Sequence, residues 1–462
     1  MQSGHAPLTQ TLAAYVSAFQ PSELPEPVRL RTLDMILDGC GALLAAANPR
    51  FSTGRLIAEF AADLGGRPVA SVVGHGFRTG PVDAALANGT MGYACDVEPH
   101  HPEGVLHPIA VMIPTALAAA ELVGADGARM VAAVALGCEV EYRLSMALGP
   151  VEQYNLGFHP SAVCGCFGAT AAAAFLLGLD RDQVVRAFGL ASCQASGLMA
   201  WESDPTENAR PFQMGMAARN GMTAALLAAK GFGGPTAIFD EGHTVFRAFS
   251  RSPDPGRLTR GLGQRFDGIM ELAIKPYSSV SFLHPALDAL LGLMRTHRLR
   301  IEDVAGLTIR FPKSGAHCID GNPLKSHCAQ YILPVAMTER GLNIADLFVD
   351  RRESDPEVTR LSRNVTVIRD EDLDREFPMR YATIIELETR SGQRFAERND
   401  VARGYPEAPL SAAEISDKFR RMAGTVAAPG RVAALEKALR GLWQATEIGT
   451  LAGLMCAKPD AA

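Results

Sequence analysis

Four short stretches of the sequence carry side chains that can move protons or hold anions. The residues of interest are Asp96, Glu98, His100, His101, His107, Tyr154, His159, Arg210 and Lys275. Histidine exchanges a proton near neutral pH, and an arginine or lysine cation binds a carboxylate. Two cations combined with histidines and carboxylates suit proton abstraction next to a carboxylate of a small polycarboxylate, followed by loss or return of a group.

His159 stands directly before Pro160 and a helix-like, small-residue stretch at 160–178. Proline is favoured at the first position of a helix, so we expect His159 at a helix N-terminus. Free backbone N–H groups and the positive end of the helix dipole favour an anion there and keep an imidazole neutral, ready to accept a proton. The alternative is that His159 only satisfies backbone groups at a buried turn.

Arg210 and Lys275 are the candidate cations. Arg210 precedes a proline that begins an apolar helix at 211–230. Lys275 also precedes a proline, which favours an extended backbone and lets the side chain reach into a cleft at a domain junction. The alternative for both is a solvated charge at the end of a helix.

The loop at 95–108 holds acids, three histidines and three prolines. Loops of this kind often carry functional sites. His100 and His107 lack the i, i+4 spacing of a helical zinc site and no cysteine pair is near, so we expect no metal. A metal-dependent or purely binding protein that uses the histidines of 96–107 is the alternative from another functional class.

Composition excludes several other classes. The net charge of −6 and the lack of a basic run give no indication of a nucleic-acid-binding surface. The sequence contains no Gly-rich phosphate loop after a strand and no Gly-x-Ser-x-Gly motif. The nine cysteines include no C-x-x-C pair, which fits free thiols in a reducing compartment. We see no secretory signal, and the apolar runs are shorter than a bilayer span, so we expect a cytoplasmic protein with no membrane partner.

The spacing of apolar residues along the sequence changes near residue 275. Up to about 270, apolar residues recur at helical spacing, including a helix expected over 181–200. Alternating segments at 304–311, 364–369 and 381–398 then predict strands, the last as a hairpin that turns at Ser391-Gly392. Helices return after 404 and should fold back onto the first domain. The pattern predicts a mainly α protein whose second domain is α+β.

Many helices are rich in Ala and Gly, and aromatic residues make up only 6% of the chain. Such helices should bury apolar faces between protomers, so we expect a homodimer.

The motifs resemble those of the MmgE/PrpD family. In order they are N-G-T-M-G-Y-A-C-D, H-P-I-A-V-M-I-P, G-F-H-P-S-A-V-C-G, A-R-P-F-Q-M-G-M-A-A-R-N-G, G-F-G-G-P, K-P-Y-S-S and R-G-Y-P-E-A-P-L-S, and they span about residue 8 to about residue 425. The family contains 2-methylcitrate dehydratases, cis-aconitate decarboxylases and iminodisuccinate epimerases. The resemblance implies a large helical domain from both chain ends (1–271 and 404–462), a smaller α+β lid (272–403), a homodimer and no cofactor.

The resemblance also implies site residues. The catalytic positions are Asp96, His107, His159 and Lys275, and Arg210 matches a cationic position. From their place beside these residues we also expect His100 and Tyr154, with Arg210, to bind substrate. Arg210 stands where several members have lysine, and arginine is a poor base but holds a carboxylate with two N–H groups. We expect His159 and Lys275 to transfer protons across the cleft of a closed lid, and we expect neither side chain to belong to the apolar core.

Two departures bear on the reaction. The acidic cluster of several members is only Asp96-Val97-Glu98 here, and the histidine that decarboxylases place five residues after the lysine is Val280. Both departures disfavour a decarboxylase, and the first also disfavours a strict 2-methylcitrate dehydratase. We expect a cofactor-independent dehydratase of a small di- or tricarboxylate similar to 2-methylcitrate. The alternatives are an epimerase or isomerase of a dicarboxylate similar to iminodisuccinate and, less favoured, a decarboxylase of cis-aconitate type.

Overall fold

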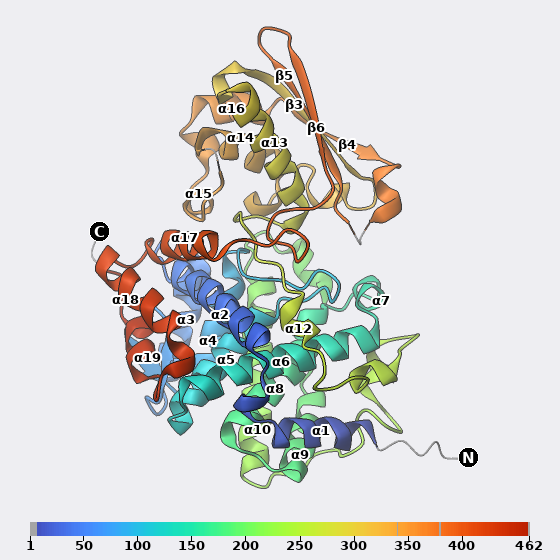
Figure 1. Ribbon diagram of the computed structural model, residues 1–462, viewed down its shortest axis with the longest axis vertical. Coiled ribbons are helices and arrows are strands. Elements are labelled where there is room, and N and C mark those ends of the chain that lie inside the picture. The colour runs from blue at the N-terminus through green and yellow to red at the C-terminus, as the bar shows by residue number, and fades with distance from the viewer. Residues whose placement is uncertain (1–6, 340, 378–379, 461–462) are drawn as a thin grey trace. The chain divides into compact units, whose positions relative to one another are not determined.

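The chain forms two units, which the computed structural model describes for residues 7–339, 341–377 and 380–460 (Figure 1). The first unit is helical and takes Met1–Ala94, Glu98–Leu272 and Ala412–Ala462, so it draws on both ends of the chain. The second unit joins Cys95–Val97 to Ala273–Ser411 and contains a four-stranded sheet. The expected fold class, mainly α with a smaller α+β part, is confirmed.

Helices make up most of the first unit, together with one short antiparallel hairpin. In chain order they are α1 (Leu8–Ala18), α2 (Glu26–Ala46), α3 (Ser52–Leu64), β1 (Ala70–Val72), β2 (Phe77–Thr79), α4 (Pro81–Ala94), α5 (Pro108–Val123), α6 (Gly127–Leu148), α7 (Pro150–Asn155), α8 (Pro160–Leu177), α9 (Arg181–Ser192), α10 (Ala209–Ala229), α11 (Val245–Phe249), α12 (Asp267–Met270), α17 (Ala412–Ala423), α18 (Pro429–Arg440) and α19 (Gly449–Cys456).

The small side chains of α8 let it pack closely on every side. Its residues from Pro160 to Leu176 are buried, and it lies against α5, α6 and α10. Among the described helices it alone is long and apolar enough to cross a membrane by length and composition, and 94% of it is buried within the protein. Its apolar character therefore serves the core of the helical unit.

Close helix approach also explains the small residues of α4 and α10. A Cβ atom added to Gly89 would lie 2.8 Å from the Cα atom of Gly215, so the two helices meet backbone to backbone. This crossing fixes the C-terminal end of α4 near the N-terminal end of α10, where site residues lie.

The helix expected over 181–200 is wrong in its C-terminal part, because α9 ends at Ser192. The chain leaves the helix to bring Gly197 (φ 151°) against Ala162, and the carbonyl of Gly197 accepts the backbone N–H of His159. A tertiary contact at the start of α8 thus overrides local helix propensity.

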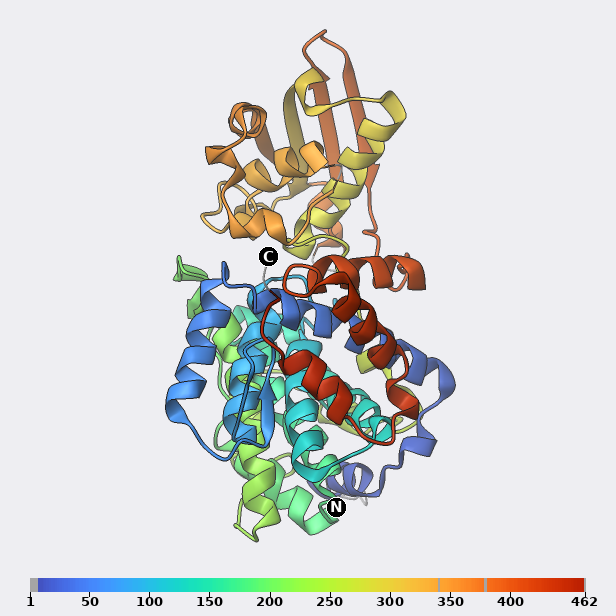
Figure 2. The same cartoon turned by 90° about the vertical axis from the view of Figure 1, so that its left-hand side faces the viewer.

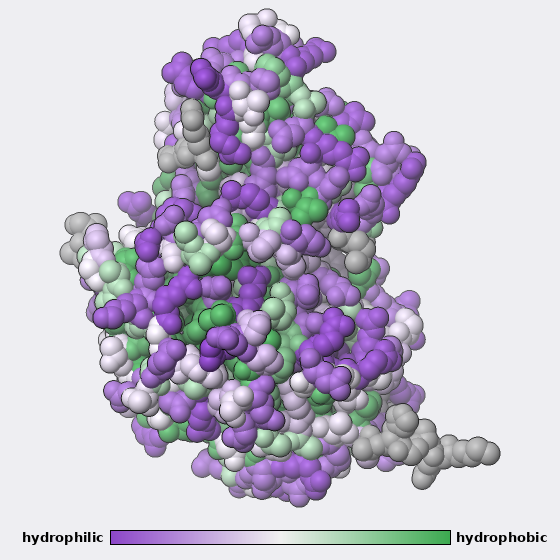
Figure 3. Space-filling view, viewed as in Figure 1, coloured by the Kyte–Doolittle hydropathy of each residue, from purple (hydrophilic) through white to green (hydrophobic). Residues whose placement is uncertain are grey.

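The C-terminal helices return to the N-terminal ones. α17 and α18 lie against α2, as Figures 1 and 2 show by the red and blue ribbons side by side. Lys418 on α17 donates to Asp38 on α2 at 2.8 Å, and both side chains are buried. The visible face of the protein is mostly polar, with apolar residues scattered over it (Figure 3).

The second unit is a mixed sheet with helices packed on it. Its elements are α13 (His284–His297), β3 (Val304–Pro312), α14 (Ala329–Glu339), α15 (Ala345–Phe348), α16 (Pro356–Ser362), β4 (Val365–Asp370), β5 (Thr383–Thr389) and β6 (Arg394–Asn399). The strand order is β4-β3-β5-β6, with β3 and β4 parallel and the other pairs antiparallel. The predicted strands and the hairpin at Gly392 are confirmed. We did not predict α16 from the sequence.

Candidate active site

Two histidines of the helical unit begin neighbouring helices in the same way. His107 is the N-cap of α5 and His159 is the N-cap of α8, and each is followed by proline at the first helical position. The backbone N–H of His107 donates to Ser161 Oγ in the first turn of α8 at 3.0 Å, which ties the two helix starts together. The predicted placement of His159 at a helix N-terminus is confirmed.

Tyr93, near the end of α4, lies between these histidines and a cation. Its ring centre is 4.4 Å from that of His107 and 6.3 Å from that of His159. The guanidinium of Arg210, in the first turn of α10, lies 4.7 Å from the Tyr93 ring centre and 5.3 Å from that of Trp201. Trp201 in turn lies 5.7 Å from His159. We call Tyr93, His107, His159, Trp201 and Arg210 the histidine cluster.

The starts of α5, α8 and α10 meet in this cluster, and each is a helix of 16 residues or more. A helix N-terminus presents free backbone N–H groups and partial positive charge. Together with the Arg210 guanidinium, the cluster is suited to an anionic ligand.

A hydrogen-bond chain fixes the tautomer of His159. Gln213 Nε2 donates to the carbonyl of Leu198 at 2.8 Å, so Gln213 Oε1 faces His159 Nδ1 and accepts its proton at 2.8 Å. The Nδ1–H tautomer leaves the lone pair of the neutral ring on Nε2.

The pKa of His159 is lowered to about 3, mainly by burial; the bond to Gln213 opposes this shift, and the nearby His107 and Arg210 add to it. At neutral pH His159 is therefore an uncharged imidazole that can accept a proton. The expected charge state holds, with burial as its largest cause.

His107 pairs with a carboxylate of the same loop. Its Nδ1 lies 2.7 Å from Glu98 Oε1, and the Glu98 side chain is 1% exposed. The His100 ring stacks on that of His107 at 6.0 Å. A carboxylate that accepts from Nδ1 orients an imidazole and supports positive charge on it, so His107 is suited to hand on a proton.

His101 has a structural role in the loop. Its ring stacks on Tyr142 at 4.4 Å, Nδ1 accepts the Gly104 N–H at 3.1 Å, and Nε2 lies 3.2 Å from the carbonyl of Asp267. Burial lowers the pKa of His101 to about 4. His101 and His107 thus have separate partners. The described residues contain no group of three or more His, Cys, Asp or Glu side chains placed to hold a metal ion.

Tyr154 contacts Glu202, which is not one of the predicted site residues. It lies on α7, is 38% exposed, and its hydroxyl donates to Glu202 Oε1 at 3.4 Å. Its predicted role in substrate binding stays a prediction.

The second unit contains its own ionic group. Lys275 Nζ donates to Asp96 Oδ1 at 2.5 Å and lies 3.3 Å from the Asp96 carbonyl. Asp96 has a left-handed backbone (φ 49°), which places its carbonyl and carboxylate on one cation. His327 Nδ1 lies 4.0 Å from Asp96 Oδ2. We call Asp96, Lys275 and His327 the lysine cluster.

Gly404 fixes the backbone beside Lys275. Its carbonyl accepts the N–H of Ile274 at 2.9 Å, and a Cβ atom at Gly404 would lie 1.9 Å from the carbonyl oxygen of Ile274. Its φ of 90° also favours glycine. The Arg-Gly-Tyr-Pro motif therefore contributes a close backbone contact to the lysine cluster.

Both predicted proton-transfer groups are buried, since Lys275 is 1% exposed and His159 is 4% exposed. Sequence reasoning missed Trp201, Gln213 and His327, which lie 42, 54 and 168 residues from His159 in the chain. No local pattern marks such residues, although a histidine after the Lys-Ser dipeptide at 325–326 could have been noted as a candidate.

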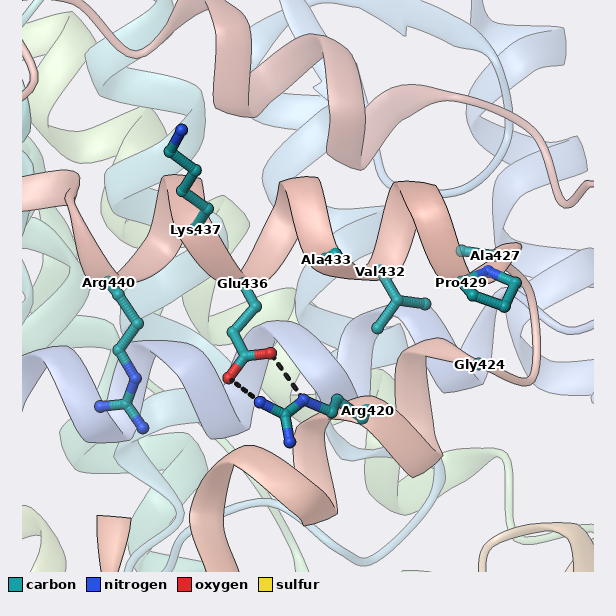
Figure 4. Close-up of a pocket in the computed structure, with 9 residues that line it drawn as sticks. All are labelled: Arg420, Gly424, Ala427, Pro429, Val432, Ala433, Glu436, Lys437 and Arg440. Atoms are coloured by element: carbon teal, nitrogen blue, oxygen red, sulfur yellow. Dashed lines mark hydrogen bonds and ion pairs between the residues drawn. The ribbon is translucent and has the colours of Figure 1, made fainter. Parts of the chain in front are cut away.

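A separate hollow on the helical unit has different chemistry. A groove between α17 and α18 is lined by Arg420, Gly424, Ala427, Pro429, Val432, Ala433, Glu436, Lys437 and Arg440 (Figure 4). Glu436, the one carboxylate in that lining, is held by Arg420 at 2.8 Å. The groove contains none of the predicted site residues, so we assign it no catalytic role.

Comparison with known proteins gives matches along most of the chain. The model of the MmgE/PrpD N-terminal domain matches residues 10–258, and that of the MmgE/PrpD C-terminal domain matches residues 277–442. A cis-aconitate decarboxylase of Aspergillus terreus is 26% identical over 97% of this chain and 96% of its own length, and the Homo sapiens cis-aconitate decarboxylase is 25% identical over 97% and 94%. A 2-methylcitrate dehydratase of Cupriavidus necator is 27% identical over 45% of each chain.

The two full-length relatives are named as decarboxylases, and each match covers 97% of this chain. The two family models together also span both units of the structure. The chain belongs to the MmgE/PrpD family.

Proposed function

We propose that this protein is a cofactor-independent lyase that removes water from a small hydroxylated di- or tricarboxylate similar to 2-methylcitrate. The observation that carries the proposal is His159, a neutral imidazole whose Nδ1 proton is held by Gln213 and whose Nε2 can accept a proton. A base of this kind next to the Arg210 cation suits removal of a proton beside a carboxylate.

In the proposed reaction Arg210 and the starts of α5, α8 and α10 hold a substrate carboxylate. His159 Nε2 takes the proton from the adjacent carbon, and the electron pair of that C–H bond forms the carbon–carbon double bond. The C–O bond on the neighbouring carbon breaks, and the departing hydroxyl takes a proton from the Lys275 ammonium and leaves as water. The reaction is redox-neutral, and the two groups return to their starting states by exchange with solvent.

The assignment of the acid rests on the ion pair of Lys275 with Asp96. Lys275 Nζ donates a hydrogen bond to Asp96 Oδ1, and this group is our first candidate for the donor of a proton to the leaving hydroxyl. His107, paired with Glu98, is the second candidate for this role. Substitution of each separates them, because the acid that acts on the hydroxyl should matter less for a substrate with a better leaving group.

Decarboxylation of an unsaturated tricarboxylate is the second candidate, favoured by the full-length similarity to cis-aconitate decarboxylases. That reaction must deliver a proton to the carbon that loses carbon dioxide. A neutral His159 is better suited to remove a proton than to deliver one, and position 280 is valine, so we place decarboxylation second. Epimerisation of a dicarboxylate, which also begins with proton removal, is third.

A panel of acids tests these alternatives in one experiment. Purified protein is incubated in D2O with 2-methylcitrate, citrate, cis-aconitate and iminodisuccinate, and the products are analysed by NMR and mass spectrometry. We expect an unsaturated acid from a hydroxylated substrate. Release of carbon dioxide from cis-aconitate would instead assign a decarboxylase, and deuterium exchange with inversion but no elimination would assign an epimerase.

We also propose a homodimer that uses the outer face of α3. Leu56, Phe60 and Leu64 recur every four residues on this helix and are 47%, 49% and 53% exposed. Three large apolar side chains in one stripe fit a contact between copies. Sedimentation should give a dimer at micromolar concentration and a monomer for Phe60→Glu, and a wild-type monomer would refute the proposal.

A further inference from the structure

Trp201 lies close to both the proposed base and the proposed carboxylate-binding cation. Its ring centre is 5.7 Å from that of His159 and 5.3 Å from the guanidinium carbon of Arg210. All three residues belong to the helical unit. A ring in this position can fix the cation relative to the base.

Backbone pairing holds the segment of Trp201 against the turn of His159. The carbonyl of Gly197 accepts the N–H of His159 at 3.0 Å, and the carbonyl of Gly157 accepts the N–H of Met199 at 2.9 Å. Trp201 follows two residues later, in a 3-10 turn. The position of the indole beside His159 is therefore set by the same contacts that shape the start of α8.

Asp204 joins the same segment to the start of α10. Its Oδ2 accepts the backbone N–H groups of Asn208 at 3.0 Å and Ala209 at 2.8 Å. These are the N-cap and the first residue of α10, and Arg210 comes next. The loop from Trp201 to Arg210 is thus held at both of its ends, which keeps the indole and the cation in one local frame.

The contact of Trp201 with Arg210 is made by the aromatic ring. The Arg210 side chain is buried, and its guanidinium lies within the range of a cation–π contact, about 6 Å, of both Trp201 and Tyr93. Trp201 Nε1 is buried and has no hydrogen-bond acceptor among the described residues. The indole is therefore placed for its ring rather than for its N–H group. Among aromatic side chains, tryptophan attracts a cation most strongly.

We propose that Trp201 is a positioning residue that holds the guanidinium of Arg210 ready to bind a substrate carboxylate beside His159. This inference rests on the proposed function and deepens it, because it assigns the group that orients the cation. Tyr93 supplies the second ring of the arrangement. An arginine side chain has many rotamers, so a contact that fixes it before binding lowers the entropic cost of binding.

Binding of a carboxylate that cannot react tests this role without turnover. The Kd of tricarballylate, a saturated tricarboxylate, is measured by calorimetry for the full-length protein and its variants. Trp201→Leu and, as a second replacement, Trp201→Met keep an apolar side chain but no aromatic face. We expect binding about tenfold weaker in both, the scale of a desolvated cation–π contact. Trp201→Phe should keep most of the affinity, and a thermal melt checks that each variant is folded.

A double-mutant cycle with Arg210→Met separates positioning from a general effect on structure. If Trp201 acts through Arg210, Trp201→Leu should weaken binding little further once the guanidinium is gone. Trp443 provides the matched control, because it is the other tryptophan of the chain and its ring lies 5.1 Å from the guanidinium of Arg29. Trp443→Leu should bind tricarballylate like the wild type. With a turned-over acid, Trp201→Leu should raise KM more than it lowers kcat.

The outcomes separate the two proposals. Non-additive losses for Trp201 and Arg210 in a protein that eliminates water from none of the acids would sustain the positioning role and refute the dehydratase. Additive losses, or an unchanged Kd in folded Trp201→Leu, would overturn the positioning role and leave the dehydratase standing. Equally weak binding in Trp201→Phe and Trp201→Leu would also overturn it, because an aromatic face would then not suffice. The same holds if Arg210→Met does not weaken tricarballylate binding, since the guanidinium would then hold no carboxylate.

Discussion

The histidine cluster and the lysine cluster both contain buried ionisable groups, but these groups are stabilised in different ways. In the histidine cluster, burial lowers the pKa of His159, so the base is held uncharged beside aromatic rings. In the lysine cluster, the charges of Asp96 and Lys275 are kept and are balanced by a direct ion pair. The proposed base is thus a neutral ring, whereas the proposed acid belongs to an ion pair.

The largest effect should come from removal of the base. His159→Asn keeps a polar side chain near Gln213 but has no nitrogen in place of Nε2, so kcat should fall by about 100-fold or more. Because a neutral side chain replaces a neutral ring, the thermal stability at pH 7.5 should change little. Steady-state kinetics and a thermal melt measure the two quantities.

Lys275→Met should lower kcat to a similar extent and also destabilise the protein. Methionine leaves the buried Asp96 carboxylate without its main cation, which costs about 3–5 kcal/mol. Adding Asp96→Asn should recover most of the stability but none of the activity. Recovery of activity in the double variant would show that Lys275 serves structure alone.

Arg210 should affect affinity more than turnover. Arg210→Ala removes a cation that is suited to a carboxylate, so KM should rise by about 10- to 100-fold. Arg210→Lys should recover part of this loss, because an ammonium replaces the charge but not the two parallel N–H donors. A fall in kcat at unchanged KM would contradict the assigned role.

The smallest effect concerns stability in acid. The pKa of His159 lies near 3 in the folded protein and near 6.5 in the unfolded chain, so the unfolded state binds more protons between these values. Stability should therefore fall as pH decreases through this window, by about 2 kcal/mol at pH 5 from this residue. Thermal melts of His159→Asn should show a shallower loss between pH 6.5 and pH 4 than the wild type. An equal slope would mean that His159 does not titrate in this way.

Local pattern was sufficient for the features that depend on neighbouring residues. The His-Pro dipeptide predicted the N-cap position of His159, and alternation predicted the hairpin around Gly392. Gln213, which sets the His159 tautomer, and His327, which faces Asp96, depend on contacts between distant segments. The same holds for the early end of α9, where Gly197 meets the start of α8.

The burial of individual side chains was the other property that the sequence pattern did not predict. We expected neither His159 nor Lys275 to belong to the apolar core, and both are polar groups that are almost fully buried. Polar residues are buried where partners satisfy them, as Gln213 and Asp96 do here, and these partners become visible only in the folded chain.

Deuterium exchange into recovered substrate tests the central claim most directly. The acid that is turned over is incubated in D2O with the wild type and with folded His159→Asn, and the unreacted substrate is analysed by mass spectrometry. We predict deuterium at the carbon next to the carboxylate with the wild type and a loss of at least about 100-fold in the exchange rate with His159→Asn. Undiminished exchange in the folded variant would contradict the assignment of His159 as the base.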